Sequence, residues 1–380
     1  MLGFIVRRVI RGIVALLAFQ FLLFALIHSL PGDYASIAGA FSGPGGRALI
    51  QRQLGLDQPF LQQYFEWLKG FVQLDFGQSF LYAQESVSGI LLDRAPRTLL
   101  LFLSAAVISY VLGIWLGKIV AWRRGGLFEV GTLSVGVAAH TSFAPWLAFL
   151  GLGIFAWNLR WLPYQHFINF NVWLRVDISV DEILLRMLIS GVALFGALLL
   201  SRLITRKSGR WRRVIGMAIF LASVLVVVAL WGRSGYSPLA VDVLRHLALP
   251  LGTVVLISFG ETMMTMRATM LETLGEDHVA AARAKGLPDK AVRDRHVARI
   301  AMLPVLTRIL LSLPFVLVGS LVIERVFFWR AMGQVVFNAI EFQDLPLIIG
   351  VLTMIGLISL VAHIFLDILY VALDPRLRYA

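Results

Sequence analysis

The stretch from Leu271 to Pro304, LETLGEDHVAAARAKGLPDKAVRDRHVARIAMLP, separates two apolar segments that are each long enough to cross a bilayer. It is rich in Ala, Arg, Lys, Glu and Asp. Gly286 suits a C-terminal cap, so the pattern predicts one short helix over residues 272–285 and a second with Pro288 in its first turn. Asp289 then lies near the positive end of the second helix. Two interpretations fit these residues: a solvated hairpin between two spans, or a docking surface.

The composition is typical of a polytopic membrane protein. Of 380 residues, 59% are apolar and only 15% are charged, and the mean hydropathy is +0.82. A soluble core could not bury that much apolar surface. The net charge of +12 comes from Lys and Arg in short segments between apolar runs, which indicates membrane topology rather than a nucleic-acid partner. Cysteine is absent, which excludes disulfides and thiolate metal sites.

Eight apolar segments have about the 20 residues that a hydrocarbon core of ~30 Å requires. They run over 9–30, 98–120, 128–157, 183–204, 214–232, 247–267, 301–328 and 346–373. Basic residues gather on one side of these segments, namely Arg7, Arg8 and Arg11, then Arg123 and Arg124, and five residues between Arg206 and Arg213. By the positive-inside rule this side is cytoplasmic, as are both termini. The expected fold class is therefore all-α, with eight spans.

Residues 31–97 form the largest segment that this topology places outside. The run from 60 to 74 carries an aromatic stripe at spacings of three and four, made of Phe60, Tyr64, Trp67, Leu68 and Phe71. We interpret it as an interfacial helix that rests on the membrane, with a ligand-binding surface as the alternative. Residues 1–30 are interpreted as a retained span, because their apolar run exceeds the roughly 7 to 15 residues of a signal peptide.

Four runs in the opening stretch resemble the coupling loop of ABC-importer permeases of the dipeptide and oligopeptide branch. They are Glu276-Asp277-His278-Val279, Ala282-Arg283-Ala284-Lys285-Gly286-Leu287, Arg295-His296 and Leu303-Pro304. The general motif is Glu-Ala-Ala with a Gly four residues later; Ala280, Ala281, Ala282 and Gly286 hold those positions, and the Glu is absent. The resemblance implies a loop that fits a cleft in a cytoplasmic ATPase. Its coupling residues would be Glu276, Asp277, Ala280, Ala281, Ala282, Arg283, Lys285, Gly286 and Arg295.

Further motifs of the same branch recur in order along most of the chain. They include Leu30-Pro31-Gly32-Asp33, Leu54-Gly55-Leu56-Asp57, Asp75-Phe76-Gly77-Gln78-Ser79, Arg94 with Pro96 and Thr98, Trp161-Leu162-Pro163, His246-Leu247 with Pro250, Glu324 with Gly333, Asp344-Leu345-Pro346 and Asp374-Pro375-Arg376. The resemblance implies a permease with a six-span core. The organisation we expect is 1–30 first span, 31–97 external segment, 98–163 spans two and three, 164–245 insertion, and 246–380 permease core with the coupling loop at 271–300.

Three features depart from the family pattern. Residues 164–245 are additional and contain spans four and five, a hairpin over 183–232 that we expect to lie outside the translocation core. Arg330-Ala331 stand where the family usually has Pro-Gly. Pro145 falls inside span three, where it should kink the helix.

Acidic residues within apolar segments are candidates for function, because a charge at mid-bilayer costs at least ~2.5 kcal/mol on insertion scales. Glu261 and Glu324 are candidates for the substrate path, and Met264 for an adaptable lining. Each has a structural alternative: Glu324 could pair with the adjacent Arg325, and the methionines could simply pack between helices. Asp367 is interpreted as a packing residue near the cytoplasmic end of span eight.

No catalytic or metal site is expected. The chain has no Gly-rich phosphate loop ending in Gly-Lys-Ser/Thr and no helix-spaced His pair of the zinc hydrolases. The resemblance implies a multi-pass permease subunit in the inner membrane that binds no cofactor itself, with ATP and Mg on partner ATPases. The implied partners are a second homologous permease, two ATPase subunits or domains, and an external solute-binding protein. The alternatives are a stand-alone ion-coupled secondary transporter and a non-transporting assembly subunit, and the cargo stays open among peptides, nickel chelates and oligosaccharides.

Overall fold

A computed structural model describes residues 2–29, 34–39, 45–53, 55–73, 75–82, 85–164, 166–174, 176–205, 212–318 and 321–373. Within these ranges the chain is helical and has no strand, apart from one isolated bridge between Gln78 and Ser86. The expected all-α class is confirmed. The motif at residues 30–33, the basic residues 206–210 and the motif at 374–376 lie outside the described part of the chain.

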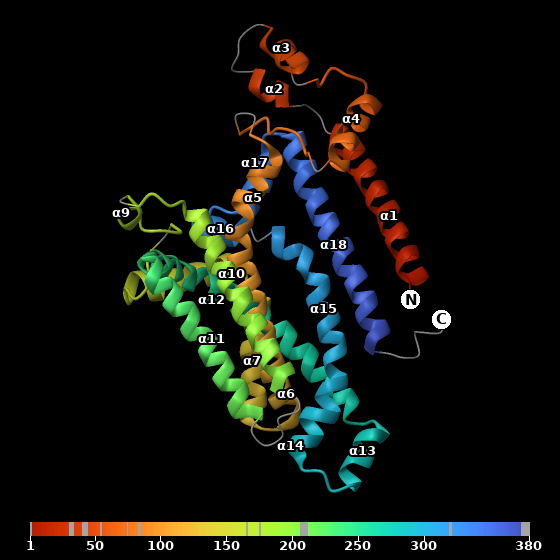
Figure 1. The fold of residues 1–380 in the computed structure, drawn as a ribbon, viewed down its shortest axis with the longest axis vertical. Coiled ribbons are helices and arrows are strands. Elements are labelled where there is room, and N and C mark those ends of the chain that lie inside the picture. The colour runs from red at the N-terminus through yellow and green to blue at the C-terminus, as the bar shows by residue number, and fades with distance from the viewer. Residues whose placement is uncertain are drawn as a thin grey trace.

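Long helices lie side by side as a bundle, with short helices at its two ends (Figure 1). At one end, α13 and α14 form the predicted loop; at the other, which we call the outer end, lie α16, α17 and the short helices α2 to α4 (Figure 1). The long helices are α1 (Leu2–His28), α5 (Val87–Thr98), α6 (Ser104–Trp122), α7 (Leu127–Thr141), α10 (Val180–Ile204), α11 (Arg212–Ser234), α12 (Ser237–Thr273), α15 (Ala298–Val318) and α18 (Leu345–Leu373). The short ones are α2 (Tyr34–Gly39), α3 (Gly46–Gln53), α4 (Phe60–Val72), α8 (Ala144–Gly151), α9 (Phe170–Trp173), α13 (Asp277–Ala284), α14 (Asp289–Ala291), α16 (Leu321–Val326) and α17 (Met332–Glu341).

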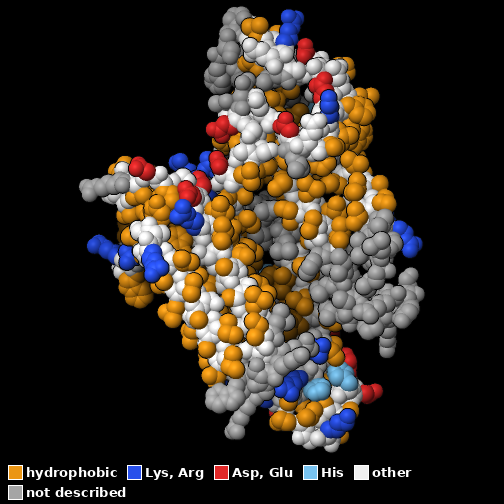
Figure 2. All heavy atoms as spheres, in the orientation of Figure 1, with side chains coloured by type: hydrophobic (Ala, Val, Ile, Leu, Met, Phe, Trp, Pro, Cys, Tyr) orange, Lys and Arg blue, Asp and Glu red, His pale blue; other side chains and the backbone are white. Residues whose placement is uncertain are grey.

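Six helices in the described residues are long and apolar enough to cross a membrane: α1, the continuous α5–α6 helix, α10, α11, α12 and α18. Hydrophobic side chains cover the middle of the visible face, while charged ones gather at both ends and along one edge (Figure 2). The expected spans 183–204, 214–232 and 247–267 all fall on such helices. Within the described residues the expected span 301–328 falls on two helices, α15 up to Val318 and α16 from Leu321 to Val326. The count of eight spans and the cytoplasmic termini stay predictions.

Span three is broken rather than merely kinked. Helices α7 and α8, with the π-helical stretch Leu152–Asn158 that continues α8, meet at an angle of 107°. Ser142 and Phe143 are extended between them, and Pro145 lies in the first turn of α8. Proline favours a helix start because its missing N–H needs no partner there. Pro145 therefore begins a new helix, and together α7 and α8 account for at most one span.

Helix α12 is the axis of the bundle, since it packs against α6, α7, α8 and α15. It approaches α7 backbone to backbone: a Cβ on Gly260 would lie 2.2 Å from the carbonyl oxygen of Gly136. Small residues permit such close crossings in membranes, where van der Waals contact drives helix association. The end of α12 at Thr273 leads directly into the predicted coupling loop, so this rigid crossing fixes where the loop emerges.

The aromatic stripe of α4 packs on protein. Tyr64 is 7% exposed and lies in a cluster with Phe24 of α1 and Ile349 of α18. Phe60, Trp67 and Leu68 pack against the same cluster. The predicted helix is present, but the expectation that its stripe rests on the membrane is wrong, because two long helices cover that face.

The predicted hairpin, residues 183–232, lies on α10 and α11, which pack on each other. None of the most apolar 18-residue stretch of α11 is buried within this chain. Helix α10 differs, because Ile183 and Leu184 in its first turns are fully buried in the main apolar cluster with Leu101 and Trp329. The hairpin is therefore built into the core at its outer end, while most of it remains open to lipid or a partner.

Candidate functional site

The predicted coupling loop forms two helical segments, as expected, with different boundaries. Helix α12 continues to Thr273, and a turn separates it from α13, which begins at Asp277. The expected start of the first helix at residue 272 is therefore wrong. Glu276, the residue before α13, is extended, with φ −80° and ψ 147°. The second segment runs from α14 through a π-helical stretch, Val292–Val297, into α15.

Gly286 ends α13 in the manner that the sequence predicts. Its φ is +70°, which is accessible to Gly at little cost. Its N–H donates to the carbonyl of Arg283 at 2.9 Å, and that of Leu287 donates to the carbonyl of Ala282 at 3.4 Å. These two bonds form a Schellman motif. Pro288 lies one position earlier than expected, immediately before the second segment, which starts at Asp289.

One face of the loop is buried and the other is free. Val279, Ala282 and Val292 lie in an apolar cluster with Ala121 of α6 and Met270 of α12. Burying a valine side chain contributes roughly 1.5–3 kcal/mol, so this cluster holds the loop against the bundle. The predicted coupling residues are divided accordingly. Ala282 is buried, and the exposed ones are Glu276, Asp277, Ala280, Ala281, Arg283, Lys285, Gly286 and Arg295.

Polar contacts also tie the loop to α6. The guanidinium of Arg283 lies 5.9 Å from the ring centre of Trp122. Asp294 accepts two hydrogen bonds from Arg293, both at 3.0 Å, and lies 3.8 Å from Lys118. Those bonds from Arg293 hold the pKa of the Asp294 carboxyl below its usual range. The loop is thereby joined to α6 and α12 at the ends that we expect to be cytoplasmic. A movement of the loop would therefore move both helices.

An ion pair between buried Glu129 and partly buried Arg267, which the sequence did not indicate, joins α7 to α12. Glu129 in the first turn of α7 is 7% exposed and accepts bonds from Arg267 Nε at 3.0 Å and Nη2 at 2.5 Å. Its other oxygen accepts from the N–H of Gly125 at 2.6 Å. A charged residue within an apolar run was the available signal. Spacing alone could not identify its partner, which lies on another helix.

Glu261 of α12 pairs with Arg308 of α15, with 2.9 Å between Oε1 and Nη1. The side chains are 46% and 48% exposed. Arg308 also donates to the Thr265 hydroxyl at 2.8 Å. A half-exposed ion pair would be costly against lipid, so this face is suited to water or to protein. Met264 is half-buried beside the cluster of Met263 and Phe259 and gives no sign of a lining role.

Glu324 is buried and does not pair with Arg325, contrary to one alternative. It accepts a hydrogen bond from the N–H of Gln334 at 3.0 Å, in the first turn of α17. A carboxylate there is favoured by the unpaired N–H groups and the dipole of the helix. Arg325 instead lies over the ring of Phe337, 4.0 Å from its centre. Glu324 therefore fixes the turn between α16 and α17. The side chain of Asp367 is outside the described part of the structure.

No group of three or more potential metal ligands occurs among the described residues. The candidate functional site has three parts: an exposed helical loop, the two helices that carry it, and one polar face between α12 and α15.

Two family models match the chain. One, described as "Binding-protein-dependent transport system inner membrane component", matches residues 180–379. The other, described as "Binding-prot-dependent transport system membrane comp, N-term", matches residues 1–102.

Curated relatives align with the whole chain. A protein of Brucella suis biovar 1 that is named as a peptide permease is 31% identical over 385 residues, covering 100% of this chain and 99% of the relative. The dipeptide transport system permease protein of Escherichia coli K12 is 29% identical over 388 residues, with the same two coverages. The di/tripeptide transport system permease protein of Pseudomonas aeruginosa is 29% identical over 384 residues, again covering 100% and 99%. The chain thus belongs to the family of inner-membrane components of binding-protein-dependent transport systems, the permease subunits of ABC importers, which work with a solute-binding protein and an ATPase.

Proposed function

We propose that this permease imports peptides, and that residues 276–295 receive the movement of the ATPases. The single observation that carries the coupling role is the two-sided construction of α13: Val279 and Ala282 hold it to α6 and α12, while eight of the nine coupling residues face outward. A docking helix needs both an anchored face and a free face. The names of the relatives, which refer to peptide, dipeptide and di/tripeptide transport, support peptides as the cargo.

The working assembly that we propose contains a second homologous permease, two ATPase subunits or domains and one external binding protein. ATP and Mg would bind to the ATPases, and this chain would supply half of the path. The Glu261–Arg308 face is the part of this half that suits an aqueous path, because both charged side chains are half exposed and Glu261 lies on the spanning helix α12. Alternating access would then follow from movement of α12 and α15, which both begin or end at the coupling loop.

Uptake by cells or proteoliposomes that contain the full complex tests this function. Labelled dipeptide, tripeptide, nickel chelate and oligosaccharide are offered separately, each with the cognate binding protein. We expect accumulation of the peptides only, and loss of that accumulation when the ATPase carries a substitution in its phosphate loop. Uptake that persists without the ATPase and collapses with a protonophore would establish the ion-coupled alternative instead. Transport of another cargo alone would refute the peptide assignment and leave the coupling role standing.

A further inference from the structure

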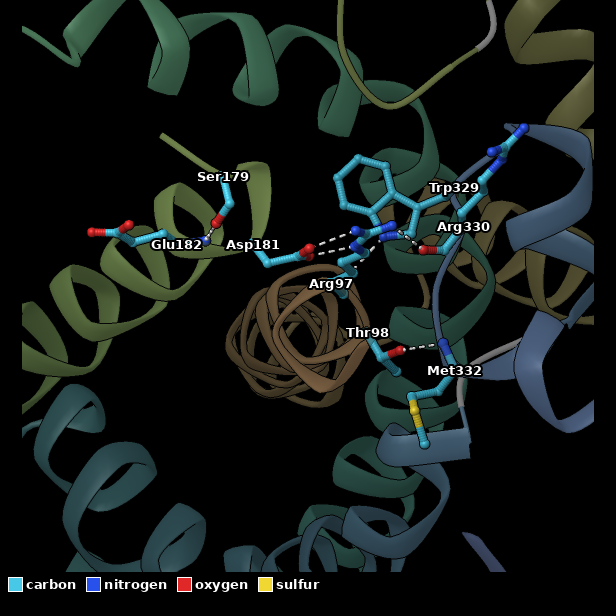
Figure 3. Close-up of polar contacts among 8 residues, drawn as sticks. All are labelled: Arg97, Thr98, Ser179, Asp181, Glu182, Trp329, Arg330 and Met332. Carbon is cyan, nitrogen blue, oxygen red and sulfur yellow. Dashed lines mark hydrogen bonds and ion pairs between the residues drawn. The ribbon is translucent and has the colours of Figure 1, made fainter. Parts of the chain in front are cut away.

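A buried arginine at the outer end of the bundle joins the additional hairpin to the segment between α16 and α17. Arg97 of α5 is 8% exposed. Its Nε and Nη2 donate to the two oxygens of Asp181 in the first turn of α10, at 2.5 Å and 2.6 Å. Its Nη1 donates to the carbonyl oxygen of Arg330 at 3.0 Å. Figure 3 shows the guanidinium between the two, with Asp181 on one side and the 329–332 segment on the other.

The same segment makes two more bonds to α5. The indole N–H of Trp329 donates to the carbonyl of Arg97 at 3.0 Å, and the N–H of Met332 donates to the hydroxyl of Thr98 at 2.9 Å (Figure 3). Trp329 is 1% exposed, and Ala331 is likewise buried. Three hydrogen bonds to α5 therefore hold residues 329–332 in place. One of them, from Arg97 to the Arg330 carbonyl, depends on the orientation of the Arg97 guanidinium.

The additional part of the chain controls that orientation. Besides Asp181, it supplies Phe167, whose ring centre lies 4.9 Å from the Arg97 guanidinium carbon and whose ring meets Trp329 edge to face. A planar guanidinium that donates hydrogen bonds to both oxygens of one carboxylate has a fixed orientation. Without Asp181, Arg97 would be a buried charge that keeps only the carbonyl oxygen of Arg330 as a hydrogen-bond acceptor among the described contacts, and such a charge is strongly unfavourable.

We propose that Asp181 is a positioning residue: it orients Arg97, and through Arg97 it holds the 329–332 segment against α5. The additional hairpin is then a working part of the outer end rather than an appendage, and it moves together with this segment when that end opens or closes. The consequence for uptake rests on the proposed transport function. The local consequence, the protection of residue 331, does not depend on it.

The chain has no cysteine, so a single Ala331→Cys reports on this segment. The complete complex, assembled with its ATPase in lipid nanodiscs, is treated with a maleimide, and the labelling rate is measured. When Asp181 is unchanged, we expect the cysteine at position 331 to label slowly. With Asp181→Asn it should label about tenfold faster, which is the factor expected from the loss of one hydrogen bond to a charged group. Uptake should fall in the same variant.

Glu182→Gln is the matched control. Glu182 neighbours Asp181, but its carboxylate pairs only with exposed Arg186 in the same helix, at 2.5 Å. Exposed pairs of this kind contribute little, so labelling and uptake should both match the parent. Equal acceleration by Glu182→Gln would show a general loosening of α10 and would overturn the proposal.

Asp181→Asn leaves Arg97 buried without its counter-charge and could prevent insertion of the chain. A second variant, Asp181→Leu with Arg97→Met, avoids this because apolar side chains often replace a buried ion pair without loss of stability. It should insert, and residue 331 should still label about tenfold faster, because the bond to the Arg330 carbonyl is gone. Parental labelling in this double variant would refute the positioning role. Failure of both variants to insert would also overturn it, in favour of a purely structural pair. Faster labelling with unchanged uptake would confirm the local role and exclude its effect on transport.

Discussion

Gly286 offers a direct test of coupling, because its substitution can alter one turn of the loop and little else. A Cβ at this position would meet no atom within 4 Å, so the added side chain has space. The penalty comes only from φ, which is +70°. The left-handed conformation costs an L residue roughly 1–2 kcal/mol, and more for a β-branched one. That cost is comparable to the roughly 1.5–3 kcal/mol gained by burying the side chain of Val279, which lies on the inner face of α13.

A series of substitutions separates this penalty from any effect of size. Asn tolerates the left-handed region, Ala less so, and Val least. We expect Gly286→Asn to behave nearly as the parent, Gly286→Ala to weaken the capped loop several-fold, and Gly286→Val to weaken it about tenfold or more. The membrane helices should be unaffected, since no atom of α12 or α15 lies within 4 Å of the added Cβ.

The assay is substrate-stimulated ATP hydrolysis of the reconstituted complex, with peptide uptake measured in parallel. Both should decline in the order Asn, Ala, Val, while the amount of assembled complex stays constant. Full stimulation in Gly286→Val would refute the argument that the Schellman turn transmits movement. An equal loss in all three variants would show that the bare glycine surface contacts the ATPase, and that the backbone conformation is not the cause.

Three further predictions follow from the structure. For orientation, Tyr164→Cys should react with an impermeant thiol reagent in intact cells and Lys285→Cys should not; the reverse result would invert the assigned topology. Replacing Gly260 by Leu would force side-chain atoms onto the backbone of Gly136, only 2.2 Å from the Cβ position, so we expect more than about 3 kcal/mol of lost stability, seen as a lower denaturation temperature in detergent or failure to accumulate. Asp294 has a folded-state pKa below its unfolded value, so its contribution should be complete above about pH 5 and disappear only as the pH falls below about 4; a loss of loop protection in hydrogen exchange between pH 8 and pH 6 would contradict this.

Much of the architecture could be predicted from the sequence, because apolar runs and their flanking charges act locally. The expected spans 183–204 and 214–232 lie on α10 and α11. The helical loop between α12 and α15 was predicted with its cap at Gly286, since a C-terminal glycine acts within two turns of its own helix. Pro145 was predicted to kink span three. That it instead starts a new helix could not be predicted, because a kink and a new helix start have the same local signal.

The partners of the charged residues could not be predicted. Glu324 was a candidate for the substrate path, with pairing to Arg325 as the alternative, but its carboxylate instead accepts from the N–H of Gln334 in the first turn of α17. Glu261 faces Arg308, a residue 47 positions away that only the packing of α15 on α12 brings near.

The sequence by itself determined that this chain is a helical membrane protein with a charged helical loop between two long apolar helices. Hydropathy and backbone preference depend on neighbours within about 20 residues, so they are legible in a linear sequence. The tertiary structure decided which polar groups meet: Arg97 of α5 finds Asp181 of α10 and the carbonyl of Arg330 in the segment between α16 and α17. In a low-dielectric interior each buried charge must have a partner, but several arrangements of helices could supply one. Only the packed bundle selects among them.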